Sequence, residues 1–203
     1  MALRTWSTNK AQLHLMEKMD FHCETRLKND RGEGIDTLYF VKEITGKGIR
    51  AYGYTIGNGK CGIRNTITDV PGVKVGHYTV RKGKNQTGVT VIIPCDGFVY
   101  ERKPLAAVYA LNGFGKTQGT VQIEELGVLE TPIALTNTLN VGKAADGLVT
   151  FTEKECRKNG KELVSVNPVV GETNDSRINQ ITERVVEAED VLFAIEHAEK
   201  NFK

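Results

Sequence analysis

The chain has 203 residues, of which 39% are hydrophobic and 26% are charged, and its formal net charge at pH 7 is +2. Such a composition is typical of a globular protein that buries a sizeable core. The near balance of charge argues against a nucleic-acid-binding surface. No apolar run approaches the roughly 20 residues that span a bilayer, and no signal-peptide core follows Met1. We therefore expect a cytoplasmic protein with neither nucleic acid nor membrane as a partner.

The four cysteines are widely separated in the sequence: Cys23, Cys61, Cys95 and Cys156. None of them forms a CxxC pair, which is the spacing that zinc sites and many redox sites use. Disulfide frameworks also require denser cysteines and an oxidising compartment. We expect four reduced, mostly buried thiols and no metal site.

Residues 1–50 differ in character from the remainder, so we predict a separate N-terminal segment followed by an α/β domain over residues 51–203. Ser7 or Thr8 is placed to cap a short helix that carries Leu13 and Met16. Residues 37–44 predict a strand.

The domain opens with a turn that leads into a strand. Pro71 sets φ at about −65° and Gly72 tolerates positive φ, which together favour a type II turn. After the turn, Val73, Val75 and His77 alternate with less apolar residues, as in a half-buried strand. A lone histidine on such a strand is usually structural rather than catalytic.

Apolar runs and helical periodicity alternate through the rest of the chain. Three apolar runs predict buried strands: 89–93, 132–136 and 163–170. Two stretches with apolar residues three and four apart predict helices: 141–149 and 191–198. Asn159-Gly160 is a typical helix end. This alternation predicts the α/β class.

The segment around Gly115-Lys116-Thr117 fits a relaxed phosphate-binding loop, in which backbone N–H groups and a lysine hold phosphates. The apolar stretch 106–111 predicts the strand that such a loop follows. However, Ala110 occupies the place of the first glycine, and no apolar strand clearly ends in a metal-binding aspartate. A nucleotide-binding domain and a simple glycine-rich turn both remain alternatives.

Polar residues follow the apolar run 132–136 directly, at Asn137 and Thr138. The carboxyl end of a buried strand is where α/β proteins commonly place their sites. The alternative is that Thr138 or Asn140 caps the helix that follows.

Seven segments resemble, in order, the L-aminopeptidase/D-esterase family of self-cleaving N-terminal-nucleophile hydrolases. They are NTITDVPGVKVGH at 65–77, TGVT at 87–90, LNGFGK at 111–116, EELG at 124–127, ETPI at 130–133, TNTL at 136–139 and ETND at 172–175. The resemblance covers residues from about Ile56 onward. It implies stacked β-sheets covered by helices on both outer faces, an αββα-like sandwich that is incomplete here because the C-terminal subunit is missing.

The resemblance also implies site residues. Asn112, Phe114 and Asn137 would bind substrate, and the side-chain amide of Asn179 would lie in the oxyanion hole. An amide N–H aimed at the developing negative charge stabilises a tetrahedral intermediate by about 3–4 kcal/mol. Ser176 and Gln180 stand where the family usually has Gly and Asp, so a polar turn before a helix is the alternative interpretation of this segment.

The family's nucleophile is a Ser or Thr that becomes the N-terminus when the precursor cleaves itself, and its α-amino group, with a pKa of about 7.7–8.0, serves as the base. That segment lies beyond the helix that follows Asn179, so we expect the nucleophile to be absent from this chain.

The resemblance therefore implies the N-terminal part of an aminopeptidase or amidase for small peptides, amino-acid amides or esters. It implies no cofactor, a C-terminal β-subunit-like partner, a homo-oligomer when complete, and an inactive chain when alone. An ornithine acetyltransferase-like enzyme, a nucleotide-binding domain and a non-catalytic remnant are the alternatives.

Overall fold

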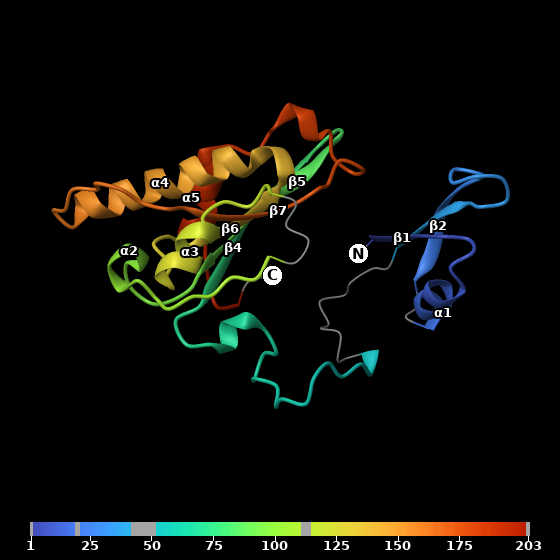
Figure 1. Ribbon diagram of the computed structural model, residues 1–203, viewed down its shortest axis with the longest axis horizontal. Coiled ribbons are helices and arrows are strands. Elements are labelled where there is room, and N and C mark those ends of the chain that lie inside the picture. The colour runs from blue at the N-terminus through green and yellow to red at the C-terminus, as the bar shows by residue number, and fades with distance from the viewer. Residues whose placement is uncertain (1, 19–20, 42–51, 111–114, 202–203) are drawn as a thin grey trace. The chain divides into compact units, whose positions relative to one another are not determined.

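The computed structural model describes residues 2–18, 21–41, 52–110 and 115–201 (Figure 1). The chain forms two compact units, Met1–Lys60 and Cys61–Lys203. In the described residues, no helix combines the length and the apolar character needed to cross a membrane.

The first unit is a three-stranded antiparallel sheet with one helix. Its elements are β1 (Ala2–Trp6), α1 (Lys10–Lys18), β2 (His22–Leu27) and β3 (Thr37–Val41), and the strand order is β1-β3-β2. The strand predicted over 37–44 is confirmed as far as Val41, and its last three residues lie outside the described part.

The short helix predicted near the N-terminus is confirmed as α1, but the predicted cap is wrong. Asn9 caps the helix, because its Oδ1 accepts the backbone N–H of Gln12 at 3.2 Å. Ser7 is engaged elsewhere: its Oγ accepts the backbone N–H of Asp36 at 3.0 Å. Met16, which the pattern placed on the buried face, is 1% exposed.

The second unit is built on one four-stranded sheet. Its strands are β4 (Lys74–Lys82), β5 (Asn85–Ile93), β6 (Ile133–Asn137) and β7 (Val169–Thr173). They lie in the order β4-β5-β6-β7, with β6 and β7 parallel and the other pairs antiparallel. Its helices are α2 (Val99–Arg102), α3 (Thr120–Leu126), α4 (Val141–Lys158) and α5 (Ala188–Glu196), and its short turns are η2 (Ile67–Asp69), η3 (Thr138–Asn140) and η4 (Ile181–Glu183).

Helices α4 and α5 pack side by side on one face of this sheet (Figure 1). Val91 and Ala134 from the strands, Leu148 from α4 and Val191 from α5 are all fully buried in the resulting core. The helices approach closely at Gly147, where an added Cβ would lie 2.8 Å from the Cβ of Val191. The predicted helices are thus confirmed, and the predicted helix end is confirmed as well, because α4 stops at Lys158 with Asn159 as its C-cap.

The other face of the sheet is covered only in part by the described residues. A second core cluster lies under α2 and α3 and contains Val99, Ile123 and Val169. Since successive side chains of a strand point to opposite faces, Thr90 points away from the helix-covered core that holds Val89 and Val91. Leu135, its partner on β6, is 42% exposed. The α/β class is confirmed, with a helix layer on one face of the sheet in this unit.

The turn before β4 forms as its sequence predicts. Gly72 has φ +87°, and the N–H of Val73 donates to the carbonyl of Val70 at 3.2 Å. An added Cβ at Gly72 would lie 2.8 Å from the backbone nitrogen of Asp96, so the close approach requires glycine as well.

Three other predictions are wrong. Residues 163–168 form no strand; the backbone N–H of Asn167 instead donates to the Glu130 carboxylate. Residues 106–110 also form no strand. The N–H of Ala106 donates to the carbonyl of Gly127, and Tyr109 is 85% exposed. Finally, Cys23 and Cys61 are exposed rather than buried.

Candidate active site

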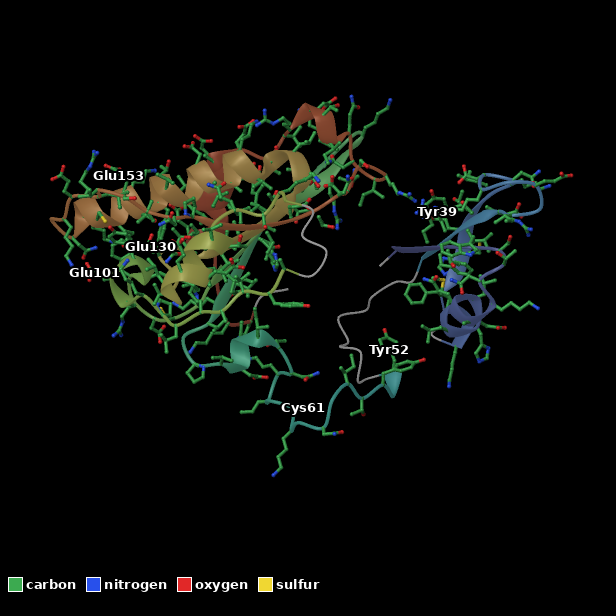
Figure 2. All side chains as sticks on the ribbon, viewed as in Figure 1. Tyr39, Tyr52, Cys61, Glu101, Glu130 and Glu153 are labelled. Carbon is green, nitrogen blue, oxygen red and sulfur yellow. The ribbon has the colours of Figure 1, made fainter. Side chains whose placement is uncertain are left out.

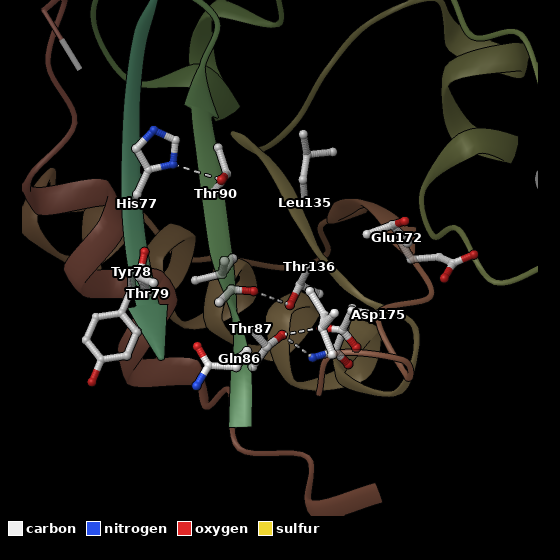
Figure 3. A pocket seen from close by; sticks show the side chains of 15 residues that line it. His77, Tyr78, Thr79, Gln86, Thr87, Thr90, Leu135, Thr136, Glu172 and Asp175 are labelled. Atoms are coloured by element: carbon white, nitrogen blue, oxygen red, sulfur yellow. Dashed lines mark hydrogen bonds between the residues drawn. The ribbon is translucent and has the colours of Figure 1, made fainter. Parts of the chain in front are cut away.

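An open cavity of about 500 Å³ lies on the uncovered part of the sheet. Residues of all four strands and of the segment after β7 line it (Figure 3). The antiparallel pairing of β4 with β5 sets His77 opposite Thr90, and the histidine Nδ1 lies 2.8 Å from the threonine Oγ1. As the sequence predicts, His77 has a hydrogen-bonded place on its strand, although it also belongs to the cavity wall.

Four polar side chains form a continuous hydrogen-bonded series that we call the polar chain: Asn137, Thr87 and Asp175, which line this cavity, and Asn179, which lines an adjoining one. The Nδ2 of Asn137 donates to Thr87 Oγ1 at 2.8 Å, and that hydroxyl donates to Asp175 Oδ2 at 2.6 Å. The Nδ2 of Asn179 donates to Asp175 Oδ1 at 3.1 Å. Figure 3 shows two of these bonds meeting at Thr87.

The sheet brings the members of the polar chain together. The register of β5 with β6 ends at the pair Thr90 and Leu135, and just beyond this end Asn137 lies within hydrogen-bond distance of Thr87. Asp175 follows the end of β7, and its backbone carbonyl accepts the N–H of Asn179 at 3.0 Å. A single turn therefore orients both the carboxylate and the amide.

Both asparagines are almost fully buried, with 2% of Asn137 and 6% of Asn179 exposed. The Oδ1 atom of each has no hydrogen-bond partner in the described part of the chain. Buried polar atoms are nearly always paired in folded proteins, so each of these two oxygens has room for a further donor, such as an ordered water or a ligand.

The structure places two of the four predicted site residues. Asn137 lies in the cavity wall, and Asn179 lines an adjoining cavity of about 330 Å³ that shares Ile178 with the first. Asn112 and Phe114 lie outside the described residues. The capping alternative for Thr138 and Asn140 is wrong, because neither side chain makes a cap hydrogen bond. Thr138 instead donates to Glu172.

Two members of the polar chain were not among the predicted site residues. Thr87 stands in the motif TGVT and Asp175 in the motif ETND. Both residues therefore stand in motifs that carry the family resemblance. However, 88 residues separate the two positions, and only the fold shows that their side chains are hydrogen-bonded.

The predicted phosphate-binding loop lacks the geometry that such a loop needs. Helix α3 begins at Thr120, after Gly119 and beyond Gly115-Lys116-Thr117. Residues 106–110, which should supply the preceding strand, are irregular. A phosphate site requires backbone N–H groups at a helix N-terminus directly after the loop, so the fold does not support the nucleotide-binding alternative.

Glu130, labelled in Figure 2, has a structural role near α2 and α3. Its Oε1 accepts a hydrogen bond from Lys103 Nζ at 2.7 Å, and its Oε2 accepts both the N–H and the side-chain amide of Asn167 at 2.9 Å. Burial by itself raises the pKa of this carboxyl, but the bonds from Lys103 and Asn167 outweigh burial and hold the pKa below its ordinary value of 4.5.

Solved structures of similar fold define the class of this protein. The PH0078 protein from Pyrococcus horikoshii OT3 is 45% identical, with a TM-score of 0.70 over 76% of this chain and 46% of its own. The L-aminopeptidase D-Ala-esterase/amidase from Ochrobactrum anthropi is 30% identical, with a TM-score of 0.63 over 71% of this chain and 43% of its own. The latter is described as a prototype for the serine aminopeptidases and as a new variant of the Ntn hydrolase fold. The sheet with its layer of helices thus follows the Ntn-hydrolase fold.

The sequence comparisons identify the family. The model of peptidase family S58 matches residues 65–203, so the chain belongs to peptidase family S58. A curated relative, beta-peptidyl aminopeptidase BapA from Sphingosinicella microcystinivorans, is 35% identical over 150 residues, which are 69% of this chain and 36% of the relative. The chain therefore spans little more than a third of the length of this relative and less than half of the solved structures.

Proposed function

We propose that this chain is the N-terminal part of a self-processing, serine-type aminopeptidase that acts on small peptides, amino-acid amides or esters. The polar chain carries the proposal: in a member of peptidase family S58, the buried Asn179 amide donates to the Asp175 carboxylate beside an open cavity, and the buried Asn137 amide is linked to the same carboxylate through the Thr87 hydroxyl. Because a relative is named a beta-peptidyl aminopeptidase, peptides with an N-terminal β-amino acid belong to the proposed substrates.

The proposed role of Asn179 follows from its hydrogen bonds. One N–H of the side-chain amide is held by Asp175, and the amide carries a second N–H. When a nucleophile attacks the scissile carbonyl carbon, the carbonyl oxygen becomes an oxyanion, and this second N–H stabilises it. As the tetrahedral intermediate collapses, the C–N bond breaks, and the leaving amine takes the proton that the α-amino base removed from the nucleophile's hydroxyl; water then hydrolyses the acyl-enzyme. Asn112, Phe114 and Asn137 would contact the substrate.

We assign the nucleophile to a C-terminal, β-subunit-like segment that packs on the uncovered face of the sheet. Leu135 and Ile178 are 42% and 64% exposed at the cavity, which supports a covering partner there. The short span of the chain relative to the family supports it too. The complete enzyme would be a homo-oligomer of such pairs.

Reconstitution tests this function. The chain is produced alone and together with the C-terminal part of the Pyrococcus horikoshii protein, its 45% identical relative. Release of p-nitroaniline from amino-acid p-nitroanilides is then measured. We expect turnover only from the pair. Hydrolysis by the chain alone would refute the division of the active site, and an inactive but stably associated pair would refute the aminopeptidase assignment.

A further inference from the structure

We propose that the adjoining cavity of about 330 Å³, which Asn179 and Arg177 line, binds a carboxylate group. In the proposed function this group is the free carboxylate of the residue that leaves, so the enzyme prefers dipeptides over dipeptide amides. The identity of the ligand rests on the proposed function. The anion site itself is argued from charge, from unpaired cations and from position.

The lining of this cavity is positively charged. Its lining residues include Lys84 and Arg177 but no aspartate or glutamate. Arg81 and Lys82 lie close to Lys84 in the chain, at the end of β4, and add to the positive charge there. Charges of one sign around a hollow raise the local concentration of ligands of the opposite sign, so this cavity attracts anions.

The two lining cations have no anionic partner. In the part of the chain that the structure describes, neither Lys84 nor Arg177 belongs to any of the ion pairs. Asp175 and Glu183, the acidic residues of the adjoining segments, accept hydrogen bonds from neutral side chains instead. Even with these two carboxylates counted, the cations around the cavity leave an excess of positive charge.

The fold holds the two sides of the cavity together. The backbone N–H of Gln180 donates to the carbonyl of Lys84 at 3.0 Å, which joins the turn between β4 and β5 to the segment after β7. Across the same junction, Asn85 Nδ2 donates to Glu183 Oε2 at 2.5 Å. Lys84 and Arg177 are far apart in the sequence, but these bonds keep their backbones at one cavity.

The cavity adjoins the place where the scissile bond is broken in the proposed function. Asn179 lines it, whereas Asp175, the hydrogen-bond partner of Asn179, lines the larger cavity. A scissile carbonyl bound at Asn179 therefore lies at the boundary between the two cavities. In a dipeptide, three bonds separate this carbonyl carbon from the carboxylate carbon, a span of roughly 4 Å. With the acyl part in the larger cavity, the carboxylate comes within reach of Arg177, two residues before Asn179.

A carboxylate matches the donors of this cavity. An arginine guanidinium forms paired hydrogen bonds with carboxylate oxygens, a lysine adds a compact positive charge, and the Ser176 hydroxyl is a further donor. A dipeptide amide offers these groups no negative charge. Because Lys84 and Arg177 are both exposed, each ion pair contributes only a few-fold in affinity.

Binding to the 203-residue chain tests the site without any turnover. β-Alanyl-L-alanine is titrated at pH 7, and β-alanyl-L-alaninamide, which has the same ammonium group but no carboxylate, is the matched probe. Side-chain amide signals of Asn179 and Gln180 in ¹⁵N–¹H NMR spectra report the position. We expect saturable shifts with the dipeptide and an affinity for the amide that is about tenfold lower. Stronger binding of inorganic phosphate than of the dipeptide would assign the cavity to a free anion and overturn the inference.

Matched variants locate the site. Lys84→Gln and Arg177→Gln should each weaken dipeptide binding by about threefold, and the double variant by about tenfold. Lys154→Gln is the control, because Lys154 is exposed on α4 and lines neither cavity. Gln180→Asp places a competing carboxylate in the cavity, so it should weaken binding more than the uncharged Gln180→Asn.

Equal affinity for the dipeptide and its amide, absence of binding, or wild-type affinity in the double variant would overturn the inference. These outcomes are distinct from failure of the proposed function, which the reconstitution assay measures. In an active pair, the ratio of kcat/KM for the dipeptide to kcat/KM for its amide should fall about tenfold in the double variant. An unchanged ratio would reject the carboxylate site while the aminopeptidase function stands.

Discussion

The side-chain amide of Asn179 lies 3.1 Å from the Asp175 carboxylate and donates a hydrogen bond to it. This bond fixes which end of the amide is nitrogen, because a carboxylate accepts and does not donate. The remaining N–H thus has a defined direction before any substrate arrives. Electrostatic stabilisation of a transition state depends on donors that are oriented in advance, so the pair explains why a buried asparagine suits the proposed role.

Replacing Asn179 by Ala should lower kcat of the reconstituted enzyme by roughly 10²–10³ and change KM little, because the bond strengthens mainly in the transition state. Steady-state kinetics on an amino-acid p-nitroanilide measure both constants. Asn179→Asp should be at least as damaging, since its carboxylate repels the oxyanion. A near-normal kcat in Asn179→Ala would move the assignment to Asn137.

Replacing Glu130 by Gln should lower the free energy of unfolding at pH 7 by about 1–3 kcal/mol, since Lys103 and Asn167 then lose a charged acceptor. The pKa of Glu130 in the folded chain is below its ordinary 4.5, so the carboxylate stabilises the fold above pH 4.5 and this contribution is lost as the pH falls further. The difference in the free energy of unfolding between variant and wild type should therefore become smaller below pH 4.5.

Urea unfolding at several pH values checks this difference. The signal is circular dichroism, because the one tryptophan, Trp6, belongs to the other compact unit. Glu124→Gln is the control, because Glu124 is an exposed carboxylate on the nearby α3. A pH-independent difference for Glu130→Gln would contradict the linkage.

Two glycines of α4 should respond in opposite ways to alanine. At Gly142 an added Cβ meets nothing within 4 Å, so Gly142→Ala should stabilise the helix by about 0.5–1 kcal/mol. At Gly147 the Cβ would lie 2.9 Å from the carbonyl oxygen of Ala188 and still closer to Val191, so Gly147→Ala should destabilise by about 1–3 kcal/mol. Thermal unfolding of both variants measures the two changes in stability. Changes of the same sign would contradict the packing of α4 on α5.

ATP with Mg²⁺ at millimolar concentration should leave the melting temperature unchanged. A ligand present at 100 times its Kd would stabilise the chain by about 2.7 kcal/mol, which a thermal shift assay detects readily. A rise in melting temperature that disappears in Lys116→Ala would restore the nucleotide-binding alternative.

Local patterns predicted local structure well. The turn at Gly72, the strands β5 and β6 and the end of α4 at Lys158 all follow from residues within a few positions of one another. Each depends on a backbone preference or on a short hydrophobic period, which the sequence shows directly.

The failures arise where backbone groups bond to distant residues. The run 163–170 is apolar enough for a strand, but Asn167 is held by Glu130, 37 residues away, and β7 begins only at Val169. Contacts between residues that are distant in the sequence also determine the candidate site. Resemblance singled out Asn137 and Asn179, whereas their link through Thr87 and Asp175 depends on strand register, which no local pattern reveals.

The first strand of the second unit is completed by one of its last segments. Val75 and Glu199 exchange two backbone hydrogen bonds of 3.0 Å, and the Thr68 hydroxyl donates to the carbonyl of Lys200, 132 residues away. At the usual elongation rates a ribosome needs on the order of ten seconds to add that many residues. During this time the outer edge of β4 on the nascent chain lacks these partners, and unpaired strand edges promote aggregation. Charged side chains on a strand blunt such an edge, so we expect Arg81 and Lys82 at the end of β4 to protect the nascent chain until translation has passed Lys200.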